Sequence, residues 1–360
     1  MKVIISAGGT GGHIYPALSI IRKIQEHDKN SQFLYIGTTD RMEADIIPKE
    51  GIPYVGIAMS GLSKNPLKCL KSIKLLMQSI SKIKKEIKNF SPDIVIGVGG
   101  YITFPVIYSA KKLGYKTLIH EQNSIPGKSN RMLIPYTDKI AVSLPGSIKY
   151  FPKEKTIFTG NPRSSEVYQA KKISKTELGL TESKKLVLIV MGSLGSMTIN
   201  QELKKIIPKL EKKDYEVILV TGKNYYDDFQ EIKVSNVKII PFLNNMLNVL
   251  KSCDLIVTRA GASTIAEITA IGLPSILVPS PYVANNHQFY NAMELVNEKA
   301  SLLLEEKDFN AVNLIAKIDM VLNDKKLYQE MHNNSLKLGK VNSSEEIYQL
   351  IKELVGNLNE

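Results

Sequence analysis

Short apolar runs alternate with helical periods along most of the chain, and the alternation occurs twice. In the first half, runs rich in β-branched residues occupy positions 2–7, 32–36, 53–57, 93–98 and 117–121. The pattern restarts in the second half, at positions 186–191, 216–221, 237–241, 255–258 and 274–278. Strands that alternate with helices are typical of parallel sheets. We therefore expect an α/β protein with two doubly wound, Rossmann-like domains that face each other across a cleft.

Each half opens with the same arrangement, a buried strand followed by a glycine-rich turn and a helix. The turns are Gly8-Gly9-Thr10-Gly11-Gly12 and Gly192-Ser193-Leu194-Gly195-Ser196. Between the halves, residues 159–163 combine a glycine with a proline, which suits an interdomain turn. We place the domains at residues 1–160 and 161–341.

The first glycine turn, residues 8–12, is a candidate binding site for a phosphate or a sugar. Four glycines let backbone N–H groups approach an anion or a sugar hydroxyl, with a helix N-terminus behind them. The turn is not a dinucleotide fingerprint, because the third glycine of GxGxxG would fall at Ile14, and no Walker lysine follows. His13 comes next, and an imidazole with an ordinary pKa near ~6.5 can accept a proton at neutral pH. A purely structural turn with a capping histidine is the alternative.

The second domain carries a similar candidate after residues 255–258. Gly261 supplies a turn, Ser263 can cap the next helix, and Glu267 lies one helical turn further, where a carboxylate could bridge two ribose hydroxyls. A solvated acid favoured by the helix dipole is the alternative for Glu267. The amides and imidazole of residues 285–288 suit recognition of hydroxyl groups.

Composition excludes several classes of protein. The chain has 360 residues, 43% of them hydrophobic, with no apolar run approaching the ~18 residues of a membrane span. Two distant cysteines give no disulfide frame or zinc site, and the N-terminal apolar run is too short for a signal peptide. The chain has no DxD triplet and its five histidines are scattered, so we expect no bound metal. A glycosyl transferase built from these parts would have to stabilise its departing phosphate with Arg163 and helix N-termini instead. A nucleophile elbow is also missing, which disfavours covalent hydrolases.

The net charge of +12 implies an anionic partner. Residues 61–90 hold eight lysines and one acid among apolar residues at helical spacing, which predicts a basic amphipathic helix suited to an anionic membrane surface. A core helix with a solvated lysine face fits the pattern equally well. Nucleic acid is disfavoured because the segment has a single aromatic residue. The candidate membrane contacts are Lys71, Lys74, Leu75, Lys82 and Lys85.

Five motifs, in order along the chain, resemble those of the MurG family of peptidoglycan glycosyltransferases, in glycosyltransferase family 28. They are residues 8–17 (GGTGGHIYPA), 99–101 (GGY), 120–123 (HEQN), 160–163 (GNPR) and 259–264 (RAGAST). The resemblance implies a GT-B fold and transfer of N-acetylglucosamine (GlcNAc) from UDP-GlcNAc, with inversion and without a cofactor. The implied acceptor is the C4 hydroxyl of the N-acetylmuramic acid in lipid I, which would give lipid II and UDP. It also implies peripheral binding at the cytoplasmic face of the cell membrane and a role in cell-wall biogenesis, cell shape and division.

The resemblance further implies which residues form the site. His13 would face the acceptor hydroxyl, with Tyr101 and Glu121 on the acceptor side, and residues 342–358 would return to the first domain. The implied UDP-GlcNAc contacts are Thr10, Gly11, Gly12, Asn123, Arg163, Ser193, Leu243, Ser263, Thr264, Glu267 and Gln288. Two departures are a second glycine turn in which residues 191–196 read MGSLGS where the family usually has GGSQGA, and Leu243 in place of a frequent isoleucine.

Two other functions share this donor chemistry. A UDP-GlcNAc 2-epimerase on the same fold would use the nucleotide sugar but no lipid. A non-catalytic protein could bind UDP-GlcNAc and turn nothing over. The basic amphipathic helix disfavours both, because neither has a reason to meet a membrane.

Overall fold

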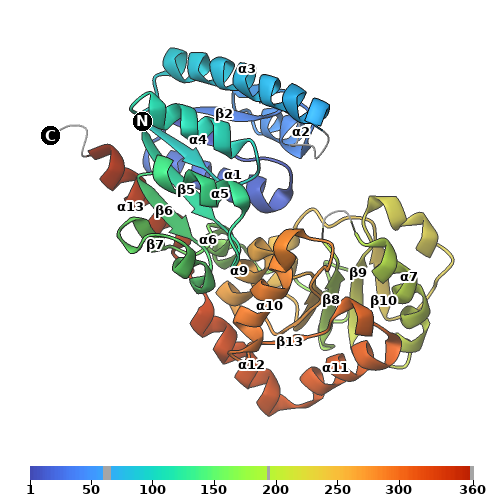
Figure 1. Ribbon diagram of the computed structural model, residues 1–360. Helices are drawn as coiled ribbons and strands as arrows, with labels where there is room; N and C mark the ends of the chain where they lie inside the picture. The colour runs from blue at the N-terminus through green and yellow to red at the C-terminus, as the bar shows by residue number, and fades with distance from the viewer. Residues whose placement is uncertain (60–65, 193–194, 357–360) are drawn as a thin grey trace. The chain divides into compact units, whose positions relative to one another are not determined.

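The chain forms two compact units, Met1–Arg163 together with the chain from Asn342 onward, and Ser164–Val341 (Figure 1). The computed structural model describes residues 1–59, 66–192 and 195–356, and it describes residues 66–74 by their backbone. Each unit is built around its own parallel sheet.

The first unit contains a seven-stranded sheet in the order β3-β2-β1-β4-β5-β6-β7, with all neighbours parallel. Its strands are β1 (Lys2–Ser6), β2 (Gln32–Thr38), β3 (Tyr54–Ile57), β4 (Ile94–Gly97), β5 (Lys116–Glu121), β6 (Lys139–Val142) and β7 (Thr156–Phe158). The strand order reverses between β1 and β4, and ligands of doubly wound sheets bind beyond the carboxyl ends of strands at such a switch point.

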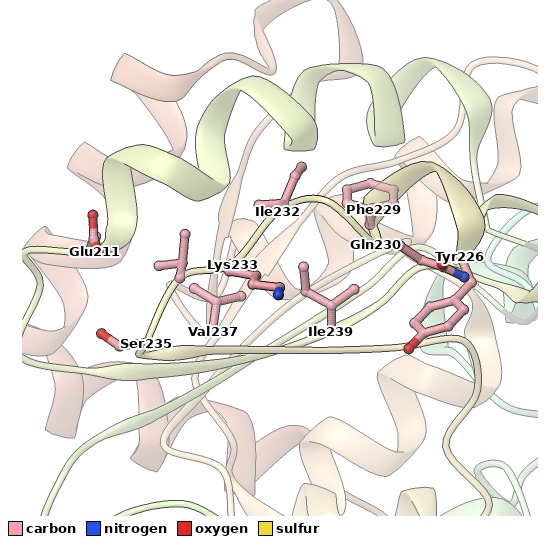
Figure 2. Close-up of a pocket in the computed structure, with 10 residues that line it drawn as sticks. Glu211, Tyr226, Phe229, Gln230, Ile232, Lys233, Ser235, Val237 and Ile239 are labelled. Atoms are coloured by element: carbon pink, nitrogen blue, oxygen red, sulfur yellow. The ribbon is translucent and has the colours of Figure 1, made fainter.

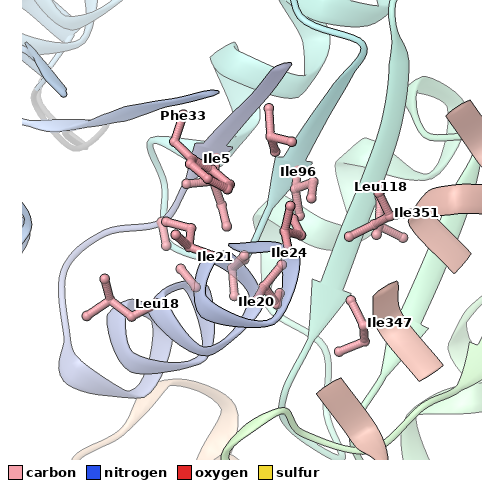
Figure 3. Close-up of a cluster of buried hydrophobic side chains, with 14 of the residues drawn as sticks. Ile5, Leu18, Ile20, Ile21, Ile24, Phe33, Ile96, Leu118, Ile347 and Ile351 are labelled. Carbon is pink, nitrogen blue, oxygen red and sulfur yellow. The ribbon is translucent and has the colours of Figure 1, made fainter. Parts of the chain in front are cut away.

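Helices cover both faces of this sheet. They are α1 (Gly11–His27), α2 (Met42–Lys49), α3 (Pro66–Phe90), α4 (Thr103–Lys112), α5 (Lys128–Leu133) and α13 (Ser343–Gly356), with short 3₁₀ turns at Ile134–Tyr136, Pro145–Tyr150 and Lys153–Lys155. Ile20 and Ile24 of α1 lie in one hydrophobic cluster with Ile347 and Ile351 of α13 on one face of the sheet (Figure 3). The His27 ring at the end of α1 also stacks on Tyr348, with 4.0 Å between ring centroids. The last helix therefore belongs to the core of the first unit.

Helix α3 packs on the opposite face of the sheet and contacts α4. Ile83 and Ile87, one turn apart, are fully buried, whereas Met77 is 64% exposed and Lys85 is exposed. The apolar side chains in the second half of the helix therefore serve the core, as the alternative of a core helix with a solvated lysine face predicts. Across the part of the chain that the structure describes, no helix combines the length and apolar character needed to cross a bilayer.

The second unit contains a six-stranded parallel sheet in the order β10-β9-β8-β11-β12-β13. Its strands are β8 (Leu186–Val190), β9 (Glu216–Val220), β10 (Val237–Ile240), β11 (Leu255–Thr258), β12 (Ser275–Leu277) and β13 (Ser301–Leu303). Its helices are α6 (Arg163–Gln169), α7 (Met197–Ile206), α8 (Met246–Leu250), α9 (Ala262–Ile271), α10 (His287–Val296), α11 (Ala311–Asn323) and α12 (Lys325–Leu338). Short 3₁₀ turns lie at Ile207–Leu210, Lys223–Tyr225, Asp227–Phe229, Ala284–Asn286 and Glu306–Asp308. Its order also reverses beside its first strand, between β8 and β11.

The prediction of two doubly wound parallel sheets is confirmed. All ten predicted strands are present, with ends that differ by at most two residues. Three further strands, β6, β7 and β13, were missed. Each has three or four residues.

Candidate functional site

Three loops of the first unit meet at the switch point of its sheet. The Gly8 N–H, after β1, donates to the Gly99 carbonyl after β4 at 3.1 Å. The Gln122 amide, after β5, donates to the Val98 carbonyl at 2.7 Å. These bonds hold the loops that carry His13, Tyr101 and Asn123 at the carboxyl edge of the central strands.

Glycine is required where these loops touch. Gly99 and Gly100 have φ of 105° and 89°, a region that side chains disfavour. A Cβ on Gly100 would lie 2.5 Å from the Gly8 carbonyl oxygen, and a Cβ on Gly99 would lie 2.6 Å from Cδ2 of His13. The missing side chains thus let the backbone and the His13 ring pack together.

His13 lies in the first turn of α1, and its hydrogen bond defines its tautomer. Its Nδ1 is 3.0 Å from the Gly8 carbonyl oxygen, which can only accept, so Nδ1 carries the proton in the neutral ring. The lone pair is then on Nε2, which lies beside Gly99. This is the protonation pattern that a base needs.

A buried carboxylate that the sequence analysis missed supports the glycine turn. Glu43, on α2, is 0% exposed. It accepts hydrogen bonds from the Gly9 N–H at 3.0 Å, and from the Thr38 N–H and hydroxyl at 3.1 and 2.7 Å. These bonds offset the cost of burying its charge. Its sequence shows only an acid in the first turn of a helix, which usually faces water, so no local pattern signals this role.

Glu121 does not present a free carboxylate, which corrects its expected place on the acceptor side. It is 2% exposed. Its oxygens accept from the backbone N–H groups of Asn123 at 2.9 Å and Gly127 at 3.0 Å, and from the Asn130 amide at 2.8 Å. Its role is to fix the loop that carries Asn123, whose own side-chain amide is 3.3 Å from the same carboxylate.

Other residues expected to contact the donor lie near the start of α1. Thr10 precedes the helix and is exposed, and Gly11 and Gly12 form its first turn. The Arg163 guanidinium lies 5.5 Å from the centre of the Tyr15 ring, also on α1. The first unit therefore holds a cation beside the helix N-terminus that follows its glycine turn.

In the second unit, a buried arginine holds Ser196, the last residue of the second glycine turn. Arg259 is 8% exposed, forms an ion pair with Glu306 at 2.6 Å, and donates to the Ser196 hydroxyl at 2.9 Å and the Val278 carbonyl at 3.2 Å. Its charge is thus matched within the protein, and it links Ser196 to the loops that follow β11 and β12. Ser193, an expected donor contact, lies outside the described residues.

The helix after β11 begins one residue after Gly261, which is its N-cap. Ser263 and Thr264 therefore lie within the first turn, and the expectation that Ser263 caps the helix is wrong. Glu267 follows one turn later and is 7% exposed. Their position places polar side chains and a carboxylate at the start of α9.

The remaining expected contacts come from neighbouring loops of the second unit. The side-chain oxygen of Gln288 accepts a hydrogen bond from the Ser280 N–H at 2.9 Å. The NH₂ group of the same side chain therefore points the other way. Asn291, also on α10, donates to the Ala260 carbonyl at 3.2 Å and so ties this helix to the loop after β11. Leu243 follows β10 and is 9% exposed. These residues all follow carboxyl ends of strands in one sheet.

A hollow of about 560 Å³ lies elsewhere in the second unit, beside the edge strand β10 (Figure 2). Tyr226, Phe229, Ile232, Lys233 and Ile239 are among the residues that line it. None of the expected site residues lines this hollow, so we do not assign it to the site.

The two halves of the chain match two models of one family. Residues 3–142 match the glycosyltransferase family 28 N-terminal domain, and residues 186–353 match its C-terminal domain. The second match includes most of α13, although that helix packs on the first unit.

Curated relatives match over their full length. One from Bacillus licheniformis is 44% identical, covering 98% of this chain and 99% of the relative. It is named UDP-N-acetylglucosamine–N-acetylmuramyl-(pentapeptide) pyrophosphoryl-undecaprenol N-acetylglucosamine transferase. A relative from Bacillus cereus with the same name, numbered 1, is also 44% identical, covering 99% and 100%.

Solved structures agree with these matches. The crystal structure of Acinetobacter baumannii MurG is 26% identical, with a TM-score of 0.78, and covers 98% of this chain and 99% of that chain. A UDP-GlcNAc 2-epimerase from Neisseria meningitidis bound to UDP-GlcNAc has a TM-score of 0.68 at 16% identity, with 98% and 100% covered. That likeness shows the fold alone. Because both domains of the family match in order and the relatives are 44% identical from end to end, the chain belongs to glycosyltransferase family 28.

Proposed function

We propose that this protein transfers GlcNAc from UDP-GlcNAc to the C4 hydroxyl of the N-acetylmuramic acid in lipid I, giving lipid II and UDP. The observation that carries the proposal is the His13 ring, with its Nε2 lone pair at the glycine-lined switch point of the first unit. The names of the full-length relatives supply the donor and the acceptor.

The reaction that we propose is a single displacement. The acceptor C4 oxygen attacks C1 of GlcNAc while His13 Nε2 takes the hydroxyl proton. The bond between C1 and the phosphate oxygen breaks, and UDP leaves with the electron pair. One attack from the face opposite the leaving group inverts C1. Arg163 and the N-terminal ends of helices would offset the charge that develops on the diphosphate.

The donor would be held mainly by the second unit. We assign the diphosphate to Ser193 and the first turn of α9, with Ser263 and Thr264, and the ribose hydroxyls to Glu267. The uracil would meet the backbone at Leu243. Gln288 and Asn123 would bind sugar hydroxyls, because each carries an amide that can both donate and accept.

Replacement of Glu267 tests the ribose assignment. Glu267→Ala is expected to raise the KM for UDP-GlcNAc roughly tenfold or more, because a hydrogen bond to a charged group contributes about 1.5–3 kcal/mol. The KM for lipid I should change little. The control is Glu298→Ala, which removes an exposed acid two residues after the end of α10 in the same unit. Equal losses toward donor and acceptor would show that Glu267 supports the fold instead.

We also propose that the protein binds the cytoplasmic face of the cell membrane peripherally, where a lipid-linked acceptor is available. Helix α3 supports this, because Met77 and Lys85 are exposed on it and its segment carries a local excess of positive charge. Lysines near an anionic surface contribute attraction that salt screens.

The activity itself is tested by release of UDP from UDP-GlcNAc by the purified protein. We expect release to require lipid I, to yield lipid II, and to persist in EDTA, because Arg163 and helix N-termini are assigned the role of offsetting the diphosphate charge. Epimerised UDP-sugar formed without any lipid would contradict the proposal. Loss of turnover in EDTA with recovery in magnesium would contradict the metal-free mechanism alone.

A further inference from the structure

We infer that Gln122 is a positioning residue for the transfer, and that its buried side-chain oxygen accepts a hydrogen bond from His13 once His13 has taken the acceptor's proton. The inference rests on the proposed role of His13 as the base. Gln122 would accept this hydrogen bond only while the His13 ring is protonated, and not while the ring is neutral.

The orientation of the Gln122 amide is fixed by its neighbours. Gln122 is 2% exposed. Its nitrogen lies 2.7 Å from the Val98 carbonyl oxygen and 3.2 Å from the His120 carbonyl oxygen. Both partners can only accept, so the NH₂ group must face them. The side-chain oxygen then points away from them, and among the described residues this buried oxygen has no hydrogen-bond partner.

His120 holds the amide from a third side. Its Nε2 is 3.1 Å from the Gly160 carbonyl oxygen, so this nitrogen carries the proton and Nδ1 accepts from the Gln122 amide at 3.0 Å. Burial lowers the pKa of His120 to about 4, which keeps the ring neutral near pH 7. A neutral ring with one defined tautomer keeps the Gln122 oxygen aimed in one direction.

The Gln122 oxygen and the His13 ring both lie beside Gly99. A Cβ placed on Gly99 would lie 2.9 Å from His13 Nε2 and 3.2 Å from the Gln122 oxygen, so both atoms border the same small space. In the neutral site they are two acceptors, because the Nδ1 proton of His13 is directed to the Gly8 carbonyl. Neither atom carries a proton, so the two cannot form a hydrogen bond with each other in this state.

Proton transfer changes this pairing. When the acceptor hydroxyl gives its proton to Nε2, that nitrogen becomes a donor and the Gln122 oxygen gains a partner, directly or through one water. A buried acceptor left unmatched in the neutral state and matched in the charged state favours the imidazolium. Other ionisable groups on the elements that meet here are Glu43 on α2, Tyr101 after β4, and Arg163 beside α1.

The test compares two substitutions that separate the oxygen from the rest of the side chain. Gln122→Met removes the oxygen at similar length, and Gln122→Glu keeps an oxygen there. We expect Gln122→Met to lower the pKa of the His13 ring, measured by NMR titration of nitrogen-labelled histidine without substrates. It should also lower kcat about tenfold and shift the acid limb of the kcat profile to lower pH. Gln122→Glu should keep the His13 pKa at or above the original value.

The outcomes separate the inference from the proposed function. An unchanged or raised His13 pKa in Gln122→Met, with UDP binding intact, would overturn the inference. An equal fall in both variants would overturn it too, since that pattern reports a distorted loop. If Gln122→Met does not fold, Gln122→Leu, which also lacks the oxygen, replaces it. A lowered His13 pKa then supports the inference, and an unchanged or raised pKa overturns it. Because the NMR titration needs no turnover, a failure of His13 as base would appear in the kinetics of His13 variants instead.

Discussion

His13→Ala is expected to lower kcat for GlcNAc transfer about a hundredfold or more, while UDP binding is preserved. A positioned general base contributes typically 10²–10⁴-fold, and the Gly8 carbonyl holds the lone pair of His13 on Nε2. Removing the ring removes the proton acceptor but leaves the backbone of the glycine turn and the second unit in place. UDP release at saturating lipid I measures kcat, and calorimetry measures UDP affinity.

Two further histidine variants make this result specific. His27→Ala removes an imidazole at the other end of the same helix, where it lies 2.8 Å from a Glu345 oxygen, and should leave kcat unchanged. The acid limb of the kcat profile should disappear in His13→Ala, because the group that must be unprotonated is gone. If His13→Gln retains near-normal kcat, a hydrogen bond suffices and the role of His13 as general base is wrong.

Replacement of four lysines of α3 by glutamate is expected to abolish binding to anionic vesicles. The positions are Lys71, Lys74, Lys82 and Lys85. Each lysine near such a surface contributes on the order of 1 kcal/mol, and reversal of each charge replaces attraction with repulsion. Since Ile83 and Ile87 are buried in the protein, charge rather than apolar insertion should dominate in this half of the helix. Co-sedimentation with vesicles at increasing salt measures the effect.

Two acceptors distinguish membrane docking from a structural role. The variant should show a raised apparent KM for lipid I in vesicles and unchanged activity on a short-chain soluble acceptor. The control is a matched fourfold charge reversal on exposed lysines of the second unit, at Lys209, Lys212, Lys325 and Lys326. Loss of activity on both acceptors would show that α3 is a core helix whose lysines only solvate it. The Lys82 ammonium donates to the Gly56 carbonyl at 3.0 Å. Of the four replacements, Lys82→Glu therefore removes a hydrogen bond within the protein.

Local patterns in the sequence predicted most of the architecture. The apolar runs at residues 2–7 and 186–191 predicted buried strands, and the glycines after them predicted turns that only glycine forms well. The positive φ of Gly99 and Gly100 shows the same property, and their motif was part of the resemblance to the family. His13 follows such a turn, so its candidacy also came from neighbours within a few residues.

The structure decided which distant groups meet. The spacing of Ile347, Ile351 and Leu354 predicts an amphipathic helix, but only the fold shows that its partner is α1, more than 300 residues earlier in the chain. Glu43 resembles a solvated acid until the glycine turn is seen to donate to it. Glu121 was expected at the acceptor, and the loop that follows it occupies its oxygens instead.

The sequence by itself therefore determined ten of the strands, the glycine turns and the identity of the proton-accepting candidate, because each depends on residues that are adjacent in the chain. The tertiary structure decided that the last helix packs on α1, that Ile83 and Ile87 are buried, and that the Gln122 oxygen lies near His13 beside Gly99. These depend on contacts between residues far apart in sequence, and a buried polar atom takes its role from whichever distant donor or acceptor the fold brings to it.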